Sequence, residues 1–134
     1  MRPPGGHGTD LAESKLMYSE RLLDHFRNPR NAGEMRPPAV VVEVSNPACG
    51  DILRLSCRLE GGIVAAVRYK ARGCTASIAA GSALTEWMKG KSVAELASLE
   101  PASVEDWLGG LASTSRHAAV LCVAGVKALL RVAG

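Results

Sequence analysis

Aromatic residues are scarce in this 134-residue chain, where they make up only 4% of the composition. A hydrophobic core must therefore be built from Ala, Val, Leu and Ile, and a hydrophobic content of 47% is enough for one compact core. No apolar run approaches the roughly 20 residues of a membrane-spanning helix. The net charge is only +3, and no block of five or more Lys or Arg residues occurs. We therefore expect no membrane and no nucleic acid among the partners.

A secretory h-region is also lacking, because the first residues are polar and rich in Pro and Gly. We expect residues 1–16 to form a flexible N-terminal tail and residues 17–134 to form a single domain. This pattern favours a cytoplasmic location, in which thiols stay reduced. The chain has four cysteines, which are Cys49, Cys57, Cys74 and Cys122. We interpret them as structural, metal-binding or reactive, and the absence of a C-x-x-C motif argues against a thiol redox enzyme.

The order of periodic segments predicts an α+β fold. The stretch YSERLLDHFRNPRNAG, residues 18–33, predicts a short helix that Ser19 caps and that ends before Pro29. Residues 39–73 contain three β-branched or alternating runs, and a Glu-Gly-Gly hairpin signal joins the last two. From Thr75 onward the pattern is helical, with small residues that allow close packing. We therefore expect a three-stranded antiparallel sheet with helices packed on one face.

Strict alternation in the second predicted strand, ILRLSCRL, assigns its side chains to two faces. Leu53, Leu55 and Cys57 share one face, and Arg54 and Arg58 lie on the other. The pattern predicts that Cys57 is a small buried hydrophobic residue and not a metal ligand. The charged face is most simply a solvated sheet surface, and the alternative is a docking surface for an acidic partner.

Two cysteine-containing corners predict a metal- or sulfur-handling site. In NPACGD, Cys49 and Asp51 lie in the connection between the first two strands, and Asp51 either satisfies turn amides or offers an oxygen ligand. In RGCTAS, Cys74 lies where the third strand ends and a helix begins, a position that stabilises thiolate. Connections in an antiparallel meander bring these corners to the same end of the sheet. His117 begins the last helix and is the candidate fourth ligand, although a histidine there can equally be a surface or capping residue.

Four stretches give the chain its family resemblance: YSERLLDHFRNPRNAG, NPACGD, RGCTASIAAGSALTEWMKGKS and RHAAVLCVAGVKALL. Together they span roughly residues 17–134, and the chain resembles the U-type iron–sulfur cluster assembly scaffolds, namely IscU and the N-terminal domain of NifU. The resemblance implies a compact α+β domain that is not an enzyme. It implies two kinds of partner. A PLP-dependent cysteine desulfurase supplies sulfur, and iron–sulfur acceptor proteins receive the cluster. The cargo it implies is iron and a transient 2Fe–2S cluster, and zinc often occupies the same site.

Carried over by position, the resemblance makes Cys49, Asp51, Cys74 and His117 the ligands. In the family pattern a third cysteine directly follows the histidine, and this chain has Ala118 there. Cys122 lies four residues further on, which is one helical turn deeper on the same face. Three arrangements stay open: a two-thiolate site, a shifted helix that makes Cys122 the third thiolate, and a Cys122 that belongs only to the core.

The substitution at Ala118 also leaves the function open between two classes. The first is a scaffold or sulfur acceptor, in which sulfur is taken up by Cys49 or Cys74. The alternative is a zinc-binding interaction module that is derived from a scaffold and no longer assembles clusters. The segment before His117 reads LASTS where the family has its chaperone-binding LPPVK, which argues against recognition by an Hsp70-type chaperone.

Overall fold

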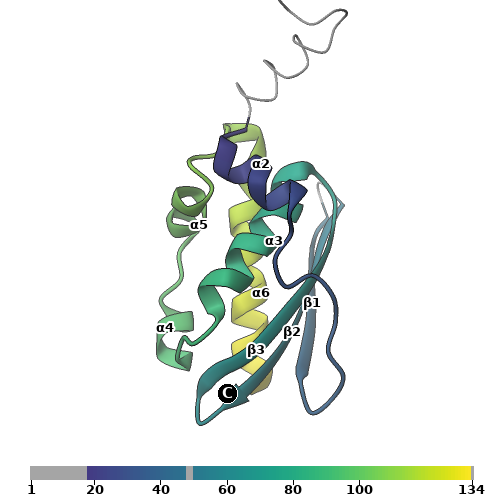
Figure 1. Ribbon diagram of the computed structural model, residues 1–134, viewed down its shortest axis with the longest axis vertical. Helices are drawn as coiled ribbons and strands as arrows, with labels where there is room; N and C mark the ends of the chain where they lie inside the picture. Colours follow the sequence, from purple (N-terminus) through teal and green to yellow (C-terminus); the bar gives the residue numbers. More distant parts are fainter. Residues whose placement is uncertain (1–17, 48–49, 134) are drawn as a thin grey trace, which may run out of the picture.

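The computed structural model describes residues 18–47 and 50–133, so the predicted tail and Cys49 lie outside the described residues. A three-stranded antiparallel sheet has the order β1-β2-β3 and forms one side of the molecule (Figure 1). The strands are β1 (Val40–Asn46), β2 (Asp51–Glu60) and β3 (Ile63–Arg72). The helices are α2 (Glu20–Arg27), α3 (Thr75–Met88), α4 (Val93–Ala97), α5 (Pro101–Trp107) and α6 (His117–Ala133), with a short 3₁₀ turn at Ser113–Ser115. The predicted α+β architecture is confirmed.

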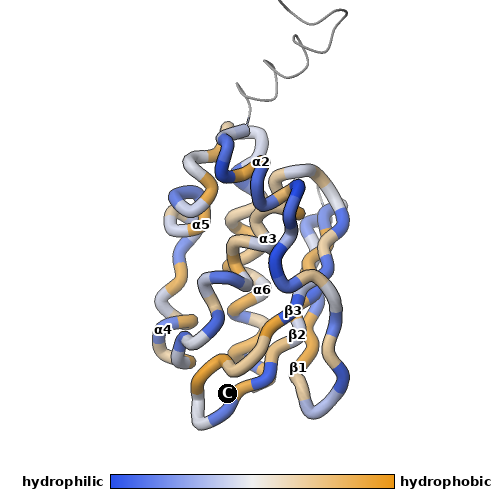
Figure 2. Tube along the Cα trace, viewed as in Figure 1, coloured by the Kyte–Doolittle hydropathy of each residue, from blue (hydrophilic) through white to orange (hydrophobic). Residues whose placement is uncertain are grey.

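Helices cover one face of the sheet in two layers (Figure 1). The helices α3 and α6 contact each other and pack on the strands, α2 packs against α3, and α4 and α5 lie against α6 on the side away from the sheet. Hydrophobic residues are concentrated along the strands, α3 and α6, where these layers meet (Figure 2). The sheet therefore buries one face, as the alternating pattern predicted.

Small residues set the close approach of the helices to the sheet. A Cβ atom added at Gly81 in α3 would lie 2.5 Å from the ring of Tyr69 in β3. A Cβ atom added at Gly125 in α6 would lie 3.0 Å from a methyl carbon of Leu53 in β2. Both glycines therefore make room for a sheet side chain, and a larger residue at either position would push the helix away from the sheet.

The predicted Ser19 cap is confirmed, and two further helix ends are defined by local contacts and backbone conformation. The Ser19 hydroxyl accepts a hydrogen bond from the Leu22 N–H at the start of α2. At α4, Ser92 and Glu95 form the reciprocal capping box that satisfies two free backbone N–H groups. Gly90 follows the end of α3 with a positive φ of 78°, the conformation that glycine adopts most easily after a helix.

The outer face of the sheet is charged but not uniformly solvated. Arg54 forms ion pairs with Glu34 and Glu43, so the basic residues there are partly neutralised. Ser56 lies on this face opposite Arg68, yet only 1% of it is exposed. The segment 31–33 runs along the free edge of β3, where the N–H of Gly33 donates to the carbonyl of Tyr69. This pairing extends the sheet by a short stretch.

The described part of the chain contains no helix that is both long and apolar enough to cross a membrane.

Cys57 is 1% exposed and points into the core, as the alternation predicted. Burial raises the pKa of the Cys57 thiol to about 11. A protonated, buried thiol of this kind behaves as a small hydrophobic side chain.

Candidate functional site

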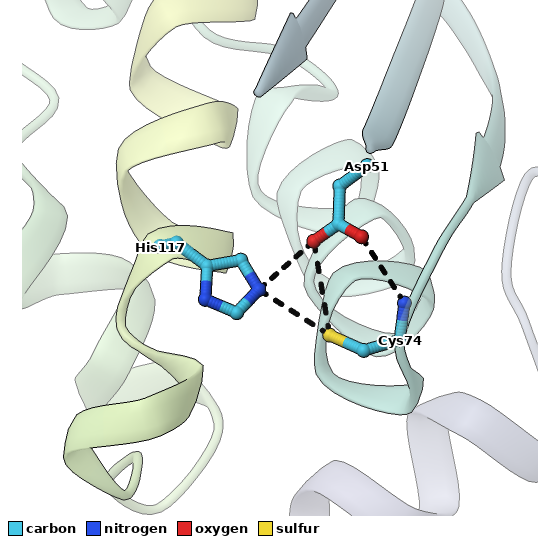
Figure 3. Close-up of side chains that lie close together, drawn as sticks. All are labelled: Asp51, Cys74 and His117. Carbon is cyan, nitrogen blue, oxygen red and sulfur yellow. Dashed lines mark hydrogen bonds and ion pairs between the residues drawn. The ribbon is translucent and has the colours of Figure 1, made fainter. Parts of the chain in front are cut away.

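Three elements that are distant in the sequence bring a carboxylate, a thiol and an imidazole together (Figure 3). Asp51 is the first residue of β2, Cys74 is the N-cap residue of α3, and His117 is the first residue of α6. One ligand atom from each residue lies within 4.8 Å of the other two. The predicted convergence of NPACGD and RGCTAS at one end of the sheet is thus realised for Asp51 and Cys74.

The three ligand atoms are in direct contact. The His117 Nε2 atom lies 2.9 Å from the Asp51 Oδ2 atom and 3.5 Å from the Cys74 Sγ atom. The Cys74 Sγ atom lies 3.8 Å from the Asp51 Oδ2 atom. The Asp51 carboxylate is buried, and 22% of the His117 side chain is exposed. The site is therefore a small polar cluster whose histidine side opens to solvent.

The Asp51 carboxylate is held by the first turn of α3. Its Oδ1 atom accepts the backbone N–H of Cys74 at 3.3 Å, and its Oδ2 atom accepts the Ser77 hydroxyl at 2.6 Å. The two donors therefore satisfy both oxygens of this buried carboxylate. Asp51 therefore satisfies a backbone amide and also turns an oxygen toward the thiol and the imidazole, so the two interpretations of this residue do not exclude each other.

Gly73 makes room for this carboxylate. It has a positive φ of 141°, which residues with a side chain rarely adopt. A Cβ atom at this position would lie 2.1 Å from the Asp51 Oδ1 atom and 2.6 Å from its carboxyl carbon. The Gly73–Cys74 dipeptide is therefore part of the site, since only glycine fits between β3 and α3 at this point.

Helix dipoles make the surroundings of the site electropositive. The N-terminus of α3 lies at Cys74 and the N-terminus of α6 lies at His117. The free N–H groups of a helix N-terminus carry partial positive charge, which favours the anionic form of a nearby thiol or carboxylate. Two helix N-termini therefore lie at the ligand cluster. Thiolate is the form of cysteine that binds metal ions and attacks sulfur donors.

The donor set and two of its three spacings are compatible with a tetrahedral metal ion. Bond lengths of about 2.1 Å to nitrogen or oxygen and 2.3 Å to sulfur place such ligand atoms about 3.4 to 3.6 Å apart. The observed sulfur–nitrogen distance of 3.5 Å agrees, and the sulfur–oxygen distance of 3.8 Å is close. The nitrogen–oxygen distance of 2.9 Å is that of a hydrogen bond, so an ion would have to replace the bond between His117 and Asp51.

An open hollow of about 240 Å³ lies beside His117, and neither Asp51 nor Cys74 lines it. Its lining residues come from the end of β1, the following turn and the first turns of α6, and they are Ser45, Asn46, Pro47, His117, Val120, Leu121 and Ala124. Val120 is 57% exposed, so the surface beside His117 is partly apolar.

The remaining predicted residues take different places. Cys49 lies outside the described residues. Cys122 is 2% exposed within the hydrophobic core, and burial raises the pKa of its thiol to about 12. Cys122 is not part of the described ligand cluster, and Ala118 is buried in the same core at 1% exposure.

Sequence reasoning missed two contributors to the site. Ser77 was read only as one of the small residues of α3, and Gly73 only as the residue before Cys74. The available signal for Gly73 was its position between a strand and a helix. Nothing in the local pattern marks Ser77, because a serine among alanines is also consistent with packing.

Comparison with protein-family models identifies the family to which the chain belongs. The model of the NifU-like N-terminal domain family matches residues 17–131. The chain belongs to this family. The family resemblance noted in the sequence is therefore confirmed over nearly the whole chain.

Curated relatives agree with this membership. The iron–sulfur cluster assembly scaffold protein IscU of Azotobacter vinelandii is 35% identical over 120 residues, which cover 87% of this chain and 93% of that protein. The bifunctional protein NifU/MnmA of Rubrobacter xylanophilus is 43% identical over 108 residues, which cover 79% of this chain. This NifU-like domain spans only 22% of the Rubrobacter protein.

Solved structures share the fold. A protein from Fervidobacterium islandicum AW-1, described as a putative iron–sulfur cluster assembly scaffold for the SUF system, superposes with a TM-score of 0.64 at 20% identity. The match covers 89% of this chain and 97% of that one. An N-terminal NifU-like protein from Brucella abortus superposes with a TM-score of 0.59 at 19% identity over 84% of this chain and 80% of that one. The NifU-like fold thus agrees with the predicted architecture.

Proposed function

We propose that this NifU-like domain is an iron–sulfur cluster assembly scaffold. It takes up iron and sulfur, holds a transient 2Fe–2S cluster or zinc, and passes the cluster to acceptor proteins. The observation that carries the proposal is the convergence of Asp51, Cys74 and His117 at one end of the sheet, where their ligand atoms lie within 4.8 Å of one another. Relatives that are named as scaffold proteins support it.

Each residue has a role in this proposal. Cys74 and Cys49 supply soft thiolates, which suit iron–sulfur chemistry, and one of them accepts sulfur from a PLP-dependent cysteine desulfurase. Asp51 supplies a harder oxygen ligand, which exchanges more readily and suits a cargo that must leave. His117 supplies an imidazole from the solvent side. The chain acts as a carrier and not as an enzyme.

The proposal assigns this role to one domain, residues 17–134, in the cytoplasm, with residues 1–16 as a tail. Recognition by an Hsp70-type chaperone is not part of it, since LASTS precedes His117. The site has two thiolates in this proposal because Ala118 stands where the family pattern has a cysteine. We expect a cluster with fewer thiolates to be held more weakly and to be released more easily.

Anaerobic reconstitution tests the function. The full chain is incubated with ferrous iron, cysteine, a cysteine desulfurase and a thiol reductant that reduces the transferred sulfur to sulfide, and cluster formation is followed by visible absorption. We expect a labile cluster on the native chain and a longer-lived one on Ala118→Cys. Cys122→Ala serves as the matched thiol control and should behave as the native chain. A cluster on Ala118→Cys together with none on the native chain would reject the scaffold function for this protein.

The same donor set favours zinc binding as a second candidate function. The sulfur–nitrogen spacing of 3.5 Å suits tetrahedral zinc, and the missing thiol at position 118 lowers the suitability for a cluster. In this case the domain would be an interaction module that holds zinc. Stoichiometric zinc after purification, loss of folding on chelation and no cluster on reconstitution would favour this second function. Metal-free protein that melts at the same temperature with and without chelator would contradict it.

A further inference from the structure

Ser77 is a buried polar residue at the edge of the ligand cluster. It lies on α3 one turn beyond Cys74 and is only 3% exposed. Its hydroxyl oxygen is 2.6 Å from the Asp51 Oδ2 atom and 3.4 Å from the Cys74 Sγ atom. The α3 segment from Ala76 to Ala83 is otherwise built from small residues and Ile78. The contacts of the Ser77 hydroxyl with Asp51 and Cys74 are therefore what distinguishes it from a packing residue.

The first turn of α3 grips both oxygens of the same carboxylate. The Cys74 N–H donates to the Asp51 Oδ1 atom, and the Ser77 hydroxyl donates to the Asp51 Oδ2 atom. Two donors that come from one rigid helix fix the rotation of a carboxylate about its terminal bonds. This rotation decides whether the Asp51 Oδ2 atom faces Cys74 and His117 or turns away from them.

We propose that Ser77 is a positioning residue that holds Asp51 ready for an incoming metal ion or cluster. The inference rests on the proposed scaffold function and deepens it. An oxygen atom of a carboxylate can accept a hydrogen bond and bind an ion at the same time. The Ser77 bond therefore persists when the ion arrives, whereas the contact of Asp51 with His117 is replaced by bonds to the ion.

The bond to Ser77 also limits the freedom of Asp51 in the empty site. An unanchored carboxylate would have to be ordered when the ion binds, and that ordering lowers affinity. Removal of such an orienting partner typically lowers metal affinity by about 10- to 100-fold. We expect Ser77→Ala to show a loss of this size.

Ser82 provides a matched control on the same helix. It is also buried, and its hydroxyl oxygen lies 2.8 Å from the His25 Nδ1 atom and accepts the Arg30 N–H at 2.9 Å. Ser82→Ala therefore removes an equally buried hydroxyl from α3 without touching Asp51. Any effect shared by both variants reports the stability of α3 and not the orientation of the carboxylate.

The experiment measures Zn²⁺ affinity by competition with a chromophoric chelator, and it records the absorption of Co²⁺ bound in place of zinc. The proteins are the full native chain, Ser77→Ala, Ser77→Thr and Ser82→Ala, each with a thermal melt. We expect Ser77→Ala to bind about 10- to 100-fold more weakly and to change the Co²⁺ spectrum. Ser77→Thr keeps the hydroxyl and should restore native affinity, and Ser82→Ala should bind as the native chain.

The outcomes separate this inference from the function on which it rests. Native affinity in Ser77→Ala, or an equal loss in Ser82→Ala, overturns the role of Ser77 and leaves the scaffold proposal standing. A failure of Ser77→Thr to recover affinity also overturns it, because the hydroxyl would then not be the active feature. If the native chain binds neither ion, the metal site itself is rejected, and the inference falls with it.

Discussion

Substitution of Gly73 by alanine should damage both the fold and the site. Two costs add at this position. The positive φ of 141° is strained for any residue with a Cβ atom, at about 1–3 kcal/mol. The new Cβ atom would also lie 2.1 Å from the buried Asp51 Oδ1 atom, and relief of such an overlap costs about 1–3 kcal/mol. We expect the free energy of unfolding to fall by about 2–6 kcal/mol.

Gly62→Ala is the control that separates these costs. Gly62 also has a positive φ, of 78°, but nothing lies within 4 Å of the position of its Cβ atom. This variant should lose only the conformational part, about 1–2 kcal/mol. Urea unfolding of both variants measures the difference, since their denaturation midpoints shift in proportion to stability when the slopes agree.

The three atoms nearest to the new Cβ atom all belong to Asp51, and the carboxylate oxygen and carbon are closer than the Cα atom. The overlap must therefore be relieved by movement of the Asp51 carboxylate. Gly73→Ala should therefore also bind Zn²⁺ at least about 10-fold more weakly than the native chain, and Gly62→Ala should not. Equal destabilisation of the two variants, with unchanged Zn²⁺ affinity in Gly73→Ala, would refute the steric reasoning.

Two further predictions concern titratable groups away from the ligand cluster. Burial, with the Arg30 charge beside the ring, holds the pKa of His25 below its usual 6.5. The unfolded chain therefore binds more protons at this residue than the folded chain does. The free energy of unfolding should fall as the pH drops from about 7 to about 5. Urea unfolding across this range should show a smaller loss for His25→Gln, and an identical loss would show that His25 does not cause it. Cys122, whose pKa burial raises to about 12, should react with an alkylating reagent at about pH 8 only after unfolding. Rapid labelling of native Cys122, detected by peptide mass spectrometry, would contradict its place in the core.

Strand faces and helix boundaries could be predicted because they depend on local patterns. The alternation from Leu53 to Leu59 assigned Cys57 to the core, since side chains in a strand alternate between faces. The cap at Ser19 was recognisable because a hydroxyl before a helical segment satisfies free N–H groups of the same segment. Each of these signals lies within a few residues of the feature it predicts.

Contacts between distant segments could be predicted only in part. The antiparallel meander predicted that Asp51 and Cys74 would meet, and they do. The hydrogen bond from Ser77 to Asp51 spans 26 residues, and serine among small residues looks like a packing residue. The burial of Ser56 had no local signal either, because alternation assigns a strand residue to a face and does not report what covers that face.

The two tryptophans of the chain are stacked on each other, which decides what intrinsic fluorescence can report. Trp87 on α3 and Trp107 at the end of α5 have ring centroids 5.2 Å apart, and the Lys91 ammonium lies 5.8 Å from the centroid of the Trp87 ring. Both tryptophans therefore report on a single interface, between α3 and α5. Their fluorescence and coupled circular dichroism will change when α5 separates from α3. A titration with a metal ion that leaves this interface intact can therefore give no change in either signal, even when the site is full.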